Sequence, residues 1–400
     1  MSRVVLVLNA GSSSLKFQVF EAEGERRRIY RGLFEGLGGN AHFIVRDSAD
    51  VQLSKVDWPP GEGLGHEGAL RHLTEWLSDH REGYRMVGVG HRVVHGGADF
   101  SRPVLITPEV IAALEKLVPL APLHQPHNLE PIRIIASRRP DLPQVACFDT
   151  AFHHGQPEIA TLFALPKAMH ESGVRRYGFH GLSYAYVASA MPDYDPRLGS
   201  GRVVVAHLGN GASLCAISAG RSIASTMGFS AIDGLPMGTR CGALDPAVVF
   251  YMIREMGLSP EEAERTLYTQ SGLLGVSGLS NDMRKLRAVE ATNADARRAI
   301  DLFVYRIARE IGSLTAALGG LDALVFTAGI GENDATTRAA VLRASAFAGF
   351  ELDEAANASG GPRITGAAGP SAWVIPTDEE RTIAQDMTAM LDRMPLPSAS

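Results

Sequence analysis

Residues 4–20 read VVLVLNAGSSSLKFQVF, and this stretch decides how the rest of the chain is interpreted. Residues 4–8 form an apolar, β-branched run, which predicts a buried strand. A polar turn over residues 9–14 interrupts this run, and the alternation of apolar and polar residues over 15–20 predicts a second strand. The stretch therefore predicts two strands joined by a turn rich in glycine and serine.

The turn offers hydrogen-bond donors that suit phosphate oxygens. The backbone N–H groups around Gly11, the hydroxyls of Ser12 and Ser14, and the Lys16 side chain are all donors. A P-loop or a dinucleotide-binding turn would lead into a helix through GxxxxGK(S/T) or GxGxxG, and this stretch has neither pattern. An ordinary surface hairpin with serine in its turn is the alternative interpretation of the stretch taken alone.

A second stretch repeats the same design half a chain later. Residues 203–206 predict a strand, residues 207–213 a turn of glycine and asparagine, and residues 214–217 a returning strand. Two such units in the two halves predict a duplicated α/β fold with a ligand in the cleft between the halves. The repeat weakens the surface-hairpin interpretation.

The composition is that of a globular protein without an electrostatic preference for nucleic acid. The 400 residues predict two or three domains, and 45% hydrophobic and 20% charged residues are typical of soluble proteins. The net charge of -6 gives no electrostatic indication of binding to nucleic acid or to an anionic membrane. Cys147, Cys215 and Cys241 fit neither a CxxC motif nor a disulfide framework, which predicts free thiols in a reducing cytoplasm. We expect no signal peptide and no membrane span.

The rest of the chain alternates strand-like and helix-like segments. Residues 120–128 predict a proline-containing loop, residues 328–333 a turn that opens a helix to about 346, and residues 355–372 a mobile surface loop. The tail at 395–400 is predicted to fray. Further strands are predicted within 28–58 and at 86–90, 144–148, 323–327 and 374–375. Helices are predicted at 67–77, 108–118, 129–137, 182–191, 246–256, 260–270, 294–318 and from 376 to about 394.

Several polar residues stand beside predicted strands or in glycine-rich loops. His91 and His95 are four residues apart, which on a helix would suit zinc, but their valine and glycine neighbours favour a strand and turn. The guanidinium of Arg92 can donate two parallel hydrogen bonds to a carboxylate or a phosphate. Asp149 follows a predicted strand, where α/β folds place functional groups. Arg240 lies in a long irregular loop at 227–245, and such loops are more often functional than structural.

These motifs resemble the acetate kinase (acetokinase) family of short-chain acyl kinases, in order and nearly from end to end. The resemblance implies two domains of the actin, sugar kinase and Hsp70 superfamily (ribonuclease H-like), with a cleft between them. It implies an N-terminal domain at 1–150 with the helix at about 381–394, and a nucleotide-binding and dimerisation domain at 151–380. The motifs that carry it are NAGSSSLK (9–16), GHRVVHGG (90–97), FDTAFH (148–153), YGFHG (177–181), HLGNGASL (207–214), GTR (238–240), SGLLG (271–275), GIGEN (329–333) and PTDEE (376–380).

The resemblance also implies an activity. Members transfer the γ-phosphoryl group of ATP to acetate, reversibly and in line, giving ADP and acetyl phosphate, a step towards acetyl-CoA. It implies Mg²⁺, for which Mn²⁺ can substitute, and a cytoplasmic homodimer that binds neither nucleic acid nor membrane. A propionate or other short-chain acyl kinase is the first alternative. Another kinase of the superfamily, acting on a sugar or glycerol, and a non-enzymatic nucleotide-gated module are more distant ones.

The family pattern carries roles to matching residues of this chain. Phosphoryl transfer puts negative charge on equatorial oxygens, so arginine forks, a histidine donor and Mg²⁺ suit this chemistry. A carboxylic acid with a pKa of about 4–5 is already ionised at pH 7, so we expect the carried-over aspartate to position other groups rather than act as a base. The implied catalytic residues are Asp149, His180 and Arg240; the metal ligands are Asn9 and Glu379; the acyl-substrate residues are Arg92, His124, Val94, Leu123, Phe179 and Ala231. The implied ATP residues are Lys16, Ser12, Ser14, His207, Leu208, Gly209, Asn210, Gly211, Asp282, Met283, Arg284, Gly329, Ile330, Gly331, Glu332 and Asn333.

The chain departs from the family pattern in its acyl pocket. Ala231 stands where the family usually has proline, and Gln125 stands where it has asparagine. The smaller side chain at 231 would leave more room beside the acyl methyl group, so we expect propionate to be used better than by an acetate-specific relative. One methylene group discriminates by only about 1–3 kcal/mol, so the expected effect is modest.

Overall fold

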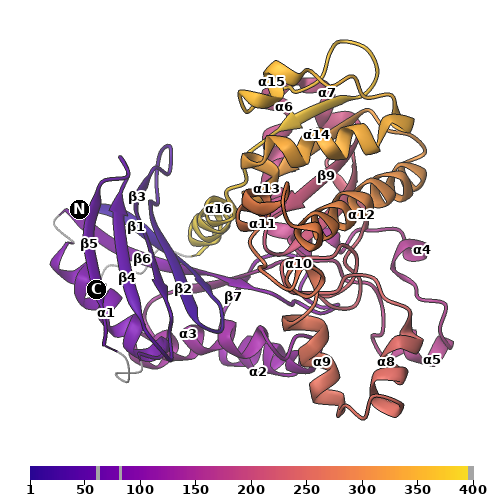
Figure 1. The fold of residues 1–400 in the computed structure, drawn as a ribbon. Coiled ribbons are helices and arrows are strands. Elements are labelled where there is room, and N and C mark those ends of the chain that lie inside the picture. The colour runs from indigo at the N-terminus through magenta and orange to yellow at the C-terminus, as the bar shows by residue number, and fades with distance from the viewer. Residues whose placement is uncertain (60–63, 81–82, 395–400) are drawn as a thin grey trace. The chain divides into compact units, whose positions relative to one another are not determined.

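The computed structural model describes residues 1–59, 64–80 and 83–394 (Figure 1). The chain separates into two compact units, one of Met1–Ala151 with Asp378–Ser400 and one of Phe152–Thr377. Each unit is an α/β body built on its own sheet. Within the described ranges, no helix combines the length and the apolar character that a membrane crossing requires.

The first unit is built on an eight-stranded sheet in the order β5-β4-β3-β2-β1-β6-β8-β7. β1 pairs antiparallel with β2 and parallel with β6, and β6 pairs parallel with β8. Its strands are β1 (Ser2–Ala10), β2 (Ser14–Glu21), β3 (Arg28–Glu35), β4 (His42–Asp47), β5 (Gln52–Asp57), β6 (Tyr84–Val93), β7 (Val104–Leu105) and β8 (Gln144–Phe148). Its helices are α1 (His66–Asp79), α2 (Pro108–Glu115), α3 (Gln125–Arg138) and α16 (Glu379–Leu391).

The predicted hairpin of residues 4–20 is confirmed as β1 and β2. The two strands pair with Asn9 opposite Lys16, and the N–H of Gly11 donates to the carbonyl of Ser14 at 2.8 Å to close the turn. Alternation along β1 sends Leu6 and its even-numbered neighbours into a core shared with α1. The hairpin therefore fixes both the central strand of the sheet and the turn that carries the serines.

Helix α16 covers β1, β6 and β8, although it lies at the end of the chain. β6 accommodates it with glycine at positions 88 and 90, because a Cβ on Gly90 would lie 2.5 Å from the Cγ2 of Ile383. Val89, between these glycines, packs instead into the core shared with α1. This close approach places Glu379, the first residue of α16, in the same unit as Asn9 and Arg92.

The second unit repeats the central part of the first sheet, which confirms the predicted duplication. Its five-stranded sheet has the order β11-β10-β9-β12-β13, with antiparallel pairs on one side of β9 and parallel pairs on the other. The order β3-β2-β1-β6-β8 has the same arrangement around β1. The strands are β9 (Arg202–Leu208), β10 (Ala212–Ser218), β11 (Arg221–Ser225), β12 (Ala323–Thr327) and β13 (Ser371–Val374).

Helices surround this second sheet. The long helix α12 contacts β9, β10 and β11, and α6 packs on a core that includes Val203 and Val205. The predicted helix at 294–318 is confirmed as α12, whose buried face makes it part of the core. The helices are α4 (Glu158–Thr161), α5 (Lys167–Glu171), α6 (Gly181–Tyr194), α7 (Pro196–Ser200), α8 (Pro246–Arg254), α9 (Pro260–Thr269), α10 (Gly272–Ser277), α11 (Met283–Val289), α12 (Ala294–Leu318), α13 (Ala328–Asn333), α14 (Ala335–Ala344) and α15 (Glu354–Ala358).

Three local predictions are wrong. The loop predicted at 120–128 ends early because α3 begins at Gln125, with a proline in its first turn, where no N–H is needed. The turn predicted at 328–333 is itself the short helix α13, separated from α14 by Asp334. The mobile loop predicted at 355–372 contains α15 and buries Ile364, so it is packed. The frayed tail predicted at 395–400 lies outside the described residues.

Candidate active site

Polar side chains of the first unit meet where three neighbouring strands end. Asn9 is near the end of β1, Arg92 near the end of β6, and Asp149 directly after β8. Because these strands are parallel, their carboxyl ends lie at one edge of the sheet. Arg92 donates from Nε to Asp149 Oδ1 at 3.0 Å, from Nη2 to Asp149 Oδ2 at 2.6 Å, and from Nη1 to Asn9 Oδ1 at 3.3 Å.

Glu379 completes this acidic and basic cluster. Its Oε2 lies 3.9 Å from the Nε of Arg92. Burial raises the pKa of Glu379 to about 7, and the charge of Arg92 works in the opposite direction. Burial also opposes the charged form of Arg92, but the carboxylates of Asp149 and Glu379 outweigh it and hold the pKa of Arg92 above its usual value. The guanidinium is thus a fixed cation between two carboxylates.

The donor set of the cluster fits a hard divalent cation. The amide oxygen of Asn9 and the carboxylate of Glu379 both lie against the same guanidinium. Oxygen ligands of this kind, one carboxylate with a neutral oxygen, suit Mg²⁺, which usually completes its shell with water and substrate phosphates. These two residues could therefore hold the metal that the family pattern implies.

Helix α3 braces the same edge through two amides: Asn128, which the sequence analysis did not single out, and Gln125, which it named only as a departure from the family pattern. Asn128 donates from Nδ2 to the carbonyl of Ala10 at 2.7 Å and accepts from the N–H of Val94 at 2.9 Å. Gln125 accepts from the N–H of His95 at 3.2 Å and donates to the carbonyl of the same residue at 3.0 Å. The ends of β1 and β6 are therefore tied to the first turn of α3.

The remaining predicted residues of the first unit are placed less closely together. Val94 is buried, whereas Leu123 is 43% exposed and His124 is half-buried at the N-cap of α3. Lys16 is exposed on β2, opposite Asn9. Ser12 is exposed and Ser14 is half-buried in the turn between β1 and β2.

In the second unit, two histidines stack beside the glycine turn of the second hairpin. His180 and His207 have ring centroids 4.2 Å apart and an interplanar angle of 19°. His180 adopts a left-handed backbone conformation, with φ of 56°, and its Nδ1 lies 2.8 Å from the hydroxyl of Ser213. The hydroxyl of Tyr184 lies 2.5 Å from the same oxygen. The hydroxyls of Tyr184 and Ser213 thus lie in sequence up to Nδ1 of His180, whereas Nε2 lies on the other side of the imidazole ring.

The turn itself passes close to His180 and Arg240. A Cβ on Gly211 would lie 3.2 Å from the Nε2 of His180 and 3.8 Å from the Nη1 of Arg240. Arg240 donates from Nη1 to the carbonyl of Ala231 at 3.0 Å. The backbone of the turn therefore lies next to two hydrogen-bond donors, and a side chain at position 211 would press on the ring of His180.

The segment 329–333 is held by an arginine that the sequence analysis did not identify. Arg338 is 1% exposed and donates to the carbonyls of Gly331 at 3.0 Å and Glu332 at 2.8 Å. It also donates to the side chain and carbonyl of Asn357. The carboxylate of Glu332 accepts from the N–H groups of Ala328 and of residue 377, so Glu332 closes α13 and faces the chain's return from β13.

The segment 282–284 has local structural contacts of its own. Asp282 caps α11, accepting from the N–H of Arg284 at 2.9 Å, and pairs with the Arg284 side chain at 2.8 Å. Met283 is buried, and the Arg284 side chain is 90% exposed. Asn210 is linked to this region because its Oδ1 accepts from Asn281 at 3.3 Å.

The duplicated sheet order, the cation between two carboxylates and the glycine turn beside two histidines suit an α/β phosphotransferase built on two similar sheets. The Acetokinase family model matches residues 4–385, and the chain belongs to that family. It is accordingly an acetate kinase in activity, a phosphotransferase whose acceptor is a carboxyl group and whose phosphoryl donor is ATP.

Named relatives and solved structures agree with this membership over the full length. An acetate kinase of Rhodopseudomonas palustris is 53% identical over 399 residues, which cover 98% of this chain and 99% of the relative. A propionate kinase structure from Francisella tularensis has a TM-score of 0.91 and 37% identity, covering 97% of this chain and 100% of that one. The acetate kinase structure from Porphyromonas gingivalis has a TM-score of 0.86 and 37% identity, covering 98% and 100%.

Proposed function

We propose that the chain transfers the γ-phosphoryl group of ATP directly to acetate, with Mg²⁺ held by Asn9 and Glu379. The observation that carries this proposal is the Arg92 guanidinium fixed between Asp149 and Glu379, with Asn9 as a third partner. Mg²⁺ would neutralise charge on the phosphate oxygens. Mn²⁺, which accepts similar oxygen ligands, would substitute for it.

Arg92 retains donors for the acyl carboxylate. A guanidinium has five N–H groups, and Asp149 accepts from the Nε group and one Nη2 group. One N–H of Nη1 donates to Asn9, so the other Nη2 N–H and the second Nη1 N–H remain to bind the substrate, and Asp149 fixes the plane in which they point. Asp149 is thus a positioning residue, because acetate is already ionised at neutral pH and offers no proton to a base.

The second unit supplies donors for the transferred group and for the nucleotide. If Tyr184 donates to the hydroxyl of Ser213, and Ser213 in turn donates to Nδ1 of His180, the imidazole proton lies on Nε2, from which it would be donated to an equatorial phosphoryl oxygen. Arg240 would contribute a second positive donor. We propose that the ATP phosphates lie along the turn of residues 207–211, and that residues 282–284 and 329–333 contact the remaining parts of the nucleotide.

The proposed acyl-substrate residues lie in both units. Val94, Leu123 and His124 belong to the first unit, and Phe179 and Ala231 to the second. The second candidate function is a propionate kinase, favoured by the small side chain of Ala231. Ala231→Pro should then lower the kcat/KM ratio of propionate to acetate by a few-fold, and an unchanged ratio would reject the role of this residue.

The proposal includes a homodimer formed through the second unit in the cytoplasm. Helix α8 supports the dimer, because Val248, Phe250 and Tyr251 are exposed apolar residues on one short helix. The buried face of α12 makes that helix a poorer interface candidate. Sedimentation of the wild-type protein and of Phe250→Asp tests this assignment: both sedimenting as the same species would refute it.

The substrate class is tested by trapping acyl phosphate as hydroxamate with ATP and Mg²⁺. Formate, acetate, propionate and butyrate are compared, and ADP release is followed with glycerol and glucose. Product from acetate, with smaller or no yield from the other acids, is expected. ADP release with glycerol or glucose and no hydroxamate would move the chain to another activity of the superfamily.

A further inference from the structure

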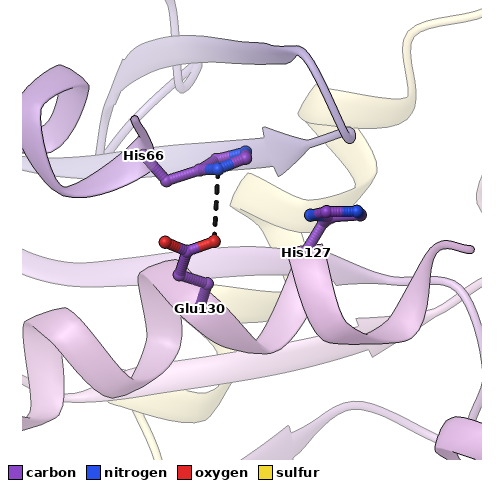
Figure 2. Close-up of side chains that lie close together, drawn as sticks. All are labelled: His66, His127 and Glu130. Atoms are coloured by element: carbon purple, nitrogen blue, oxygen red, sulfur yellow. Dashed lines mark ion pairs between the residues drawn. The ribbon is translucent and has the colours of Figure 1, made fainter. Parts of the chain in front are cut away.

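Three side chains outside the proposed kinase site converge in the first unit. His66 is the first residue of α1, and His127 and Glu130 project from one face of α3 towards it (Figure 2). His127 and Glu130 are three residues apart on the helix and therefore neighbours on its surface. One nitrogen or oxygen atom from each of the three residues lies within 4.8 Å of the other two.

The hydrogen bonds of His66 determine where its proton lies. Its Nε2 is 2.8 Å from the carbonyl oxygen of Gly11, which can only accept, so Nε2 carries the proton. Its Nδ1 is 3.2 Å from Oε2 of Glu130. Nδ1 of a neutral His66 then carries the lone pair, and a carboxylate oxygen of Glu130 lies 3.2 Å from this nitrogen, beside the face of the ring (Figure 2).

A histidine held in this way suits a metal ion as a ligand. Ligating histidines commonly donate their second N–H to a backbone carbonyl, as His66 does to Gly11. Two ligand atoms on a tetrahedral Zn²⁺ are about 3.4 Å apart, from bonds of about 2.1 Å. The 3.2 Å between Nδ1 of His66 and Oε2 of Glu130 is close to that separation.

His127 is placed to be the third ligand. Its ring stacks on His66 with centroids 5.8 Å apart and an interplanar angle of 24°. Burial and the neighbouring His66 lower the pKa of His127, while Glu130 works in the opposite direction. The Glu130 side chain is 44% exposed, so its carboxylate has room to adjust when an ion binds.

We propose that His66, His127 and Glu130 bind a divalent transition metal of the Zn²⁺ class, with one coordination position open. Two imidazoles and one carboxylate suit Zn²⁺, Co²⁺ or Ni²⁺, whereas Mg²⁺ prefers oxygen ligands alone. The ion would tie α1 to α3. Through the Gly11 carbonyl it would also tie both helices to the turn between β1 and β2. None of its three ligands is a residue of the proposed kinase site.

The test is metal binding by the full-length, metal-stripped protein without nucleotide. Zn²⁺ is titrated against a chromogenic chelator, and Co²⁺ is followed by its visible absorption. The variants are His127→Ala and Glu130→Gln; the control is His42→Ala, because His42 also lies 3.0 Å from a glutamate, Glu35, but on the surface of β4.

The wild-type protein and His42→Ala should bind Zn²⁺ equally, in the presence of excess Mg²⁺. Both His127→Ala and Glu130→Gln should weaken Zn²⁺ binding by at least about tenfold and abolish the tetrahedral Co²⁺ spectrum. Equal Zn²⁺ affinity in all four proteins would overturn the proposal and leave a protonated His66 paired with Glu130. Glu130→Gln keeps the test decisive if His127→Ala unfolds, because Glu130 is partly exposed.

Discussion

Replacing Asp149 by asparagine removes one charge from the Arg92 cluster with almost no change in volume. Asp149 is 1% exposed in its side chain and accepts three hydrogen bonds from Arg92, at 2.6, 3.0 and 3.2 Å. Asparagine keeps one acceptor oxygen and turns an NH₂ group towards the guanidinium, so the paired geometry cannot form. Arg92 would then shift towards Glu379, whose carboxylate lies 3.9 Å away.

The size of the loss expected for Asp149→Asn follows from the burial of the Arg92–Asp149 ion pair. Two unit charges about 4 Å apart attract by about 4 kcal/mol at an effective dielectric of about 20. Removing one partner of a buried pair costs about 3–5 kcal/mol. Because Glu379 remains as a second partner, we expect a loss near the lower end, about 3 kcal/mol. A loss of that size in binding the acyl carboxylate corresponds to roughly a hundredfold in kcat/KM for acetate.

The assay is the steady-state rate of hydroxamate formation against acetate concentration at saturating ATP. The KM for ATP and the unfolding midpoint in urea are measured alongside, to separate substrate binding from stability. The matched control is Asp141→Asn, because Asp141 forms a comparable bidentate pair with Arg139 on the surface. Asp149→Asn with kcat/KM within about threefold of the control would refute the positioning role.

Three further predictions concern other parts of the chain. Burial raises the pKa of Asp386 to about 6, so the stability contributed by this group is present below about pH 4 and is lost as the pH rises through 6. Asp386→Asn should abolish this pH dependence, and its free energy of unfolding in urea at pH 7 should be about 2 kcal/mol higher than that of the wild type. Arg338→Leu leaves buried carbonyls without a donor and should lower the free energy of unfolding by about 4 kcal/mol, whereas Arg343→Leu, on the exposed side of the same helix, should change it by less than about 0.5 kcal/mol. Tyr184→Phe removes a hydroxyl that orients His180 through Ser213 and should lower kcat about tenfold with little change in either KM; an unaltered kcat would exclude this chain of hydroxyls.

The elements with a clear residue pattern could be predicted from the sequence. The hairpin of β1 and β2 follows from alternating apolar residues around a polar turn, and α12 from its long amphipathic repeat. The start of α3 was missed because prolines usually end helices, but Pro126 lies in the first turn, where its missing N–H costs nothing. Boundaries that depend on such local exceptions are not visible in hydrophobic periodicity.

In the candidate site, too, some features could be predicted from the sequence and others could not. Arg92 and Asp149 could be named as chemical groups, but their pairing joins residues 57 positions apart and depends on the order of strands in the sheet. Arg338 was missed because a helical arginine is usually exposed, and only packing against Asn357 shows that it is buried. Long-range hydrogen bonds of this kind have no local signature.

Whether any side chain becomes phosphorylated is decided most directly by the stereochemical course at phosphorus. ATP made chiral at the γ-phosphorus with oxygen isotopes is used to phosphorylate acetate, and the configuration of the acetyl phosphate is determined. Direct in-line transfer between the two substrates, with Arg92, His180 and Arg240 only positioning and neutralising charge, predicts inversion. Retention would reveal a phosphorylated residue on the enzyme and would contradict the proposed mechanism.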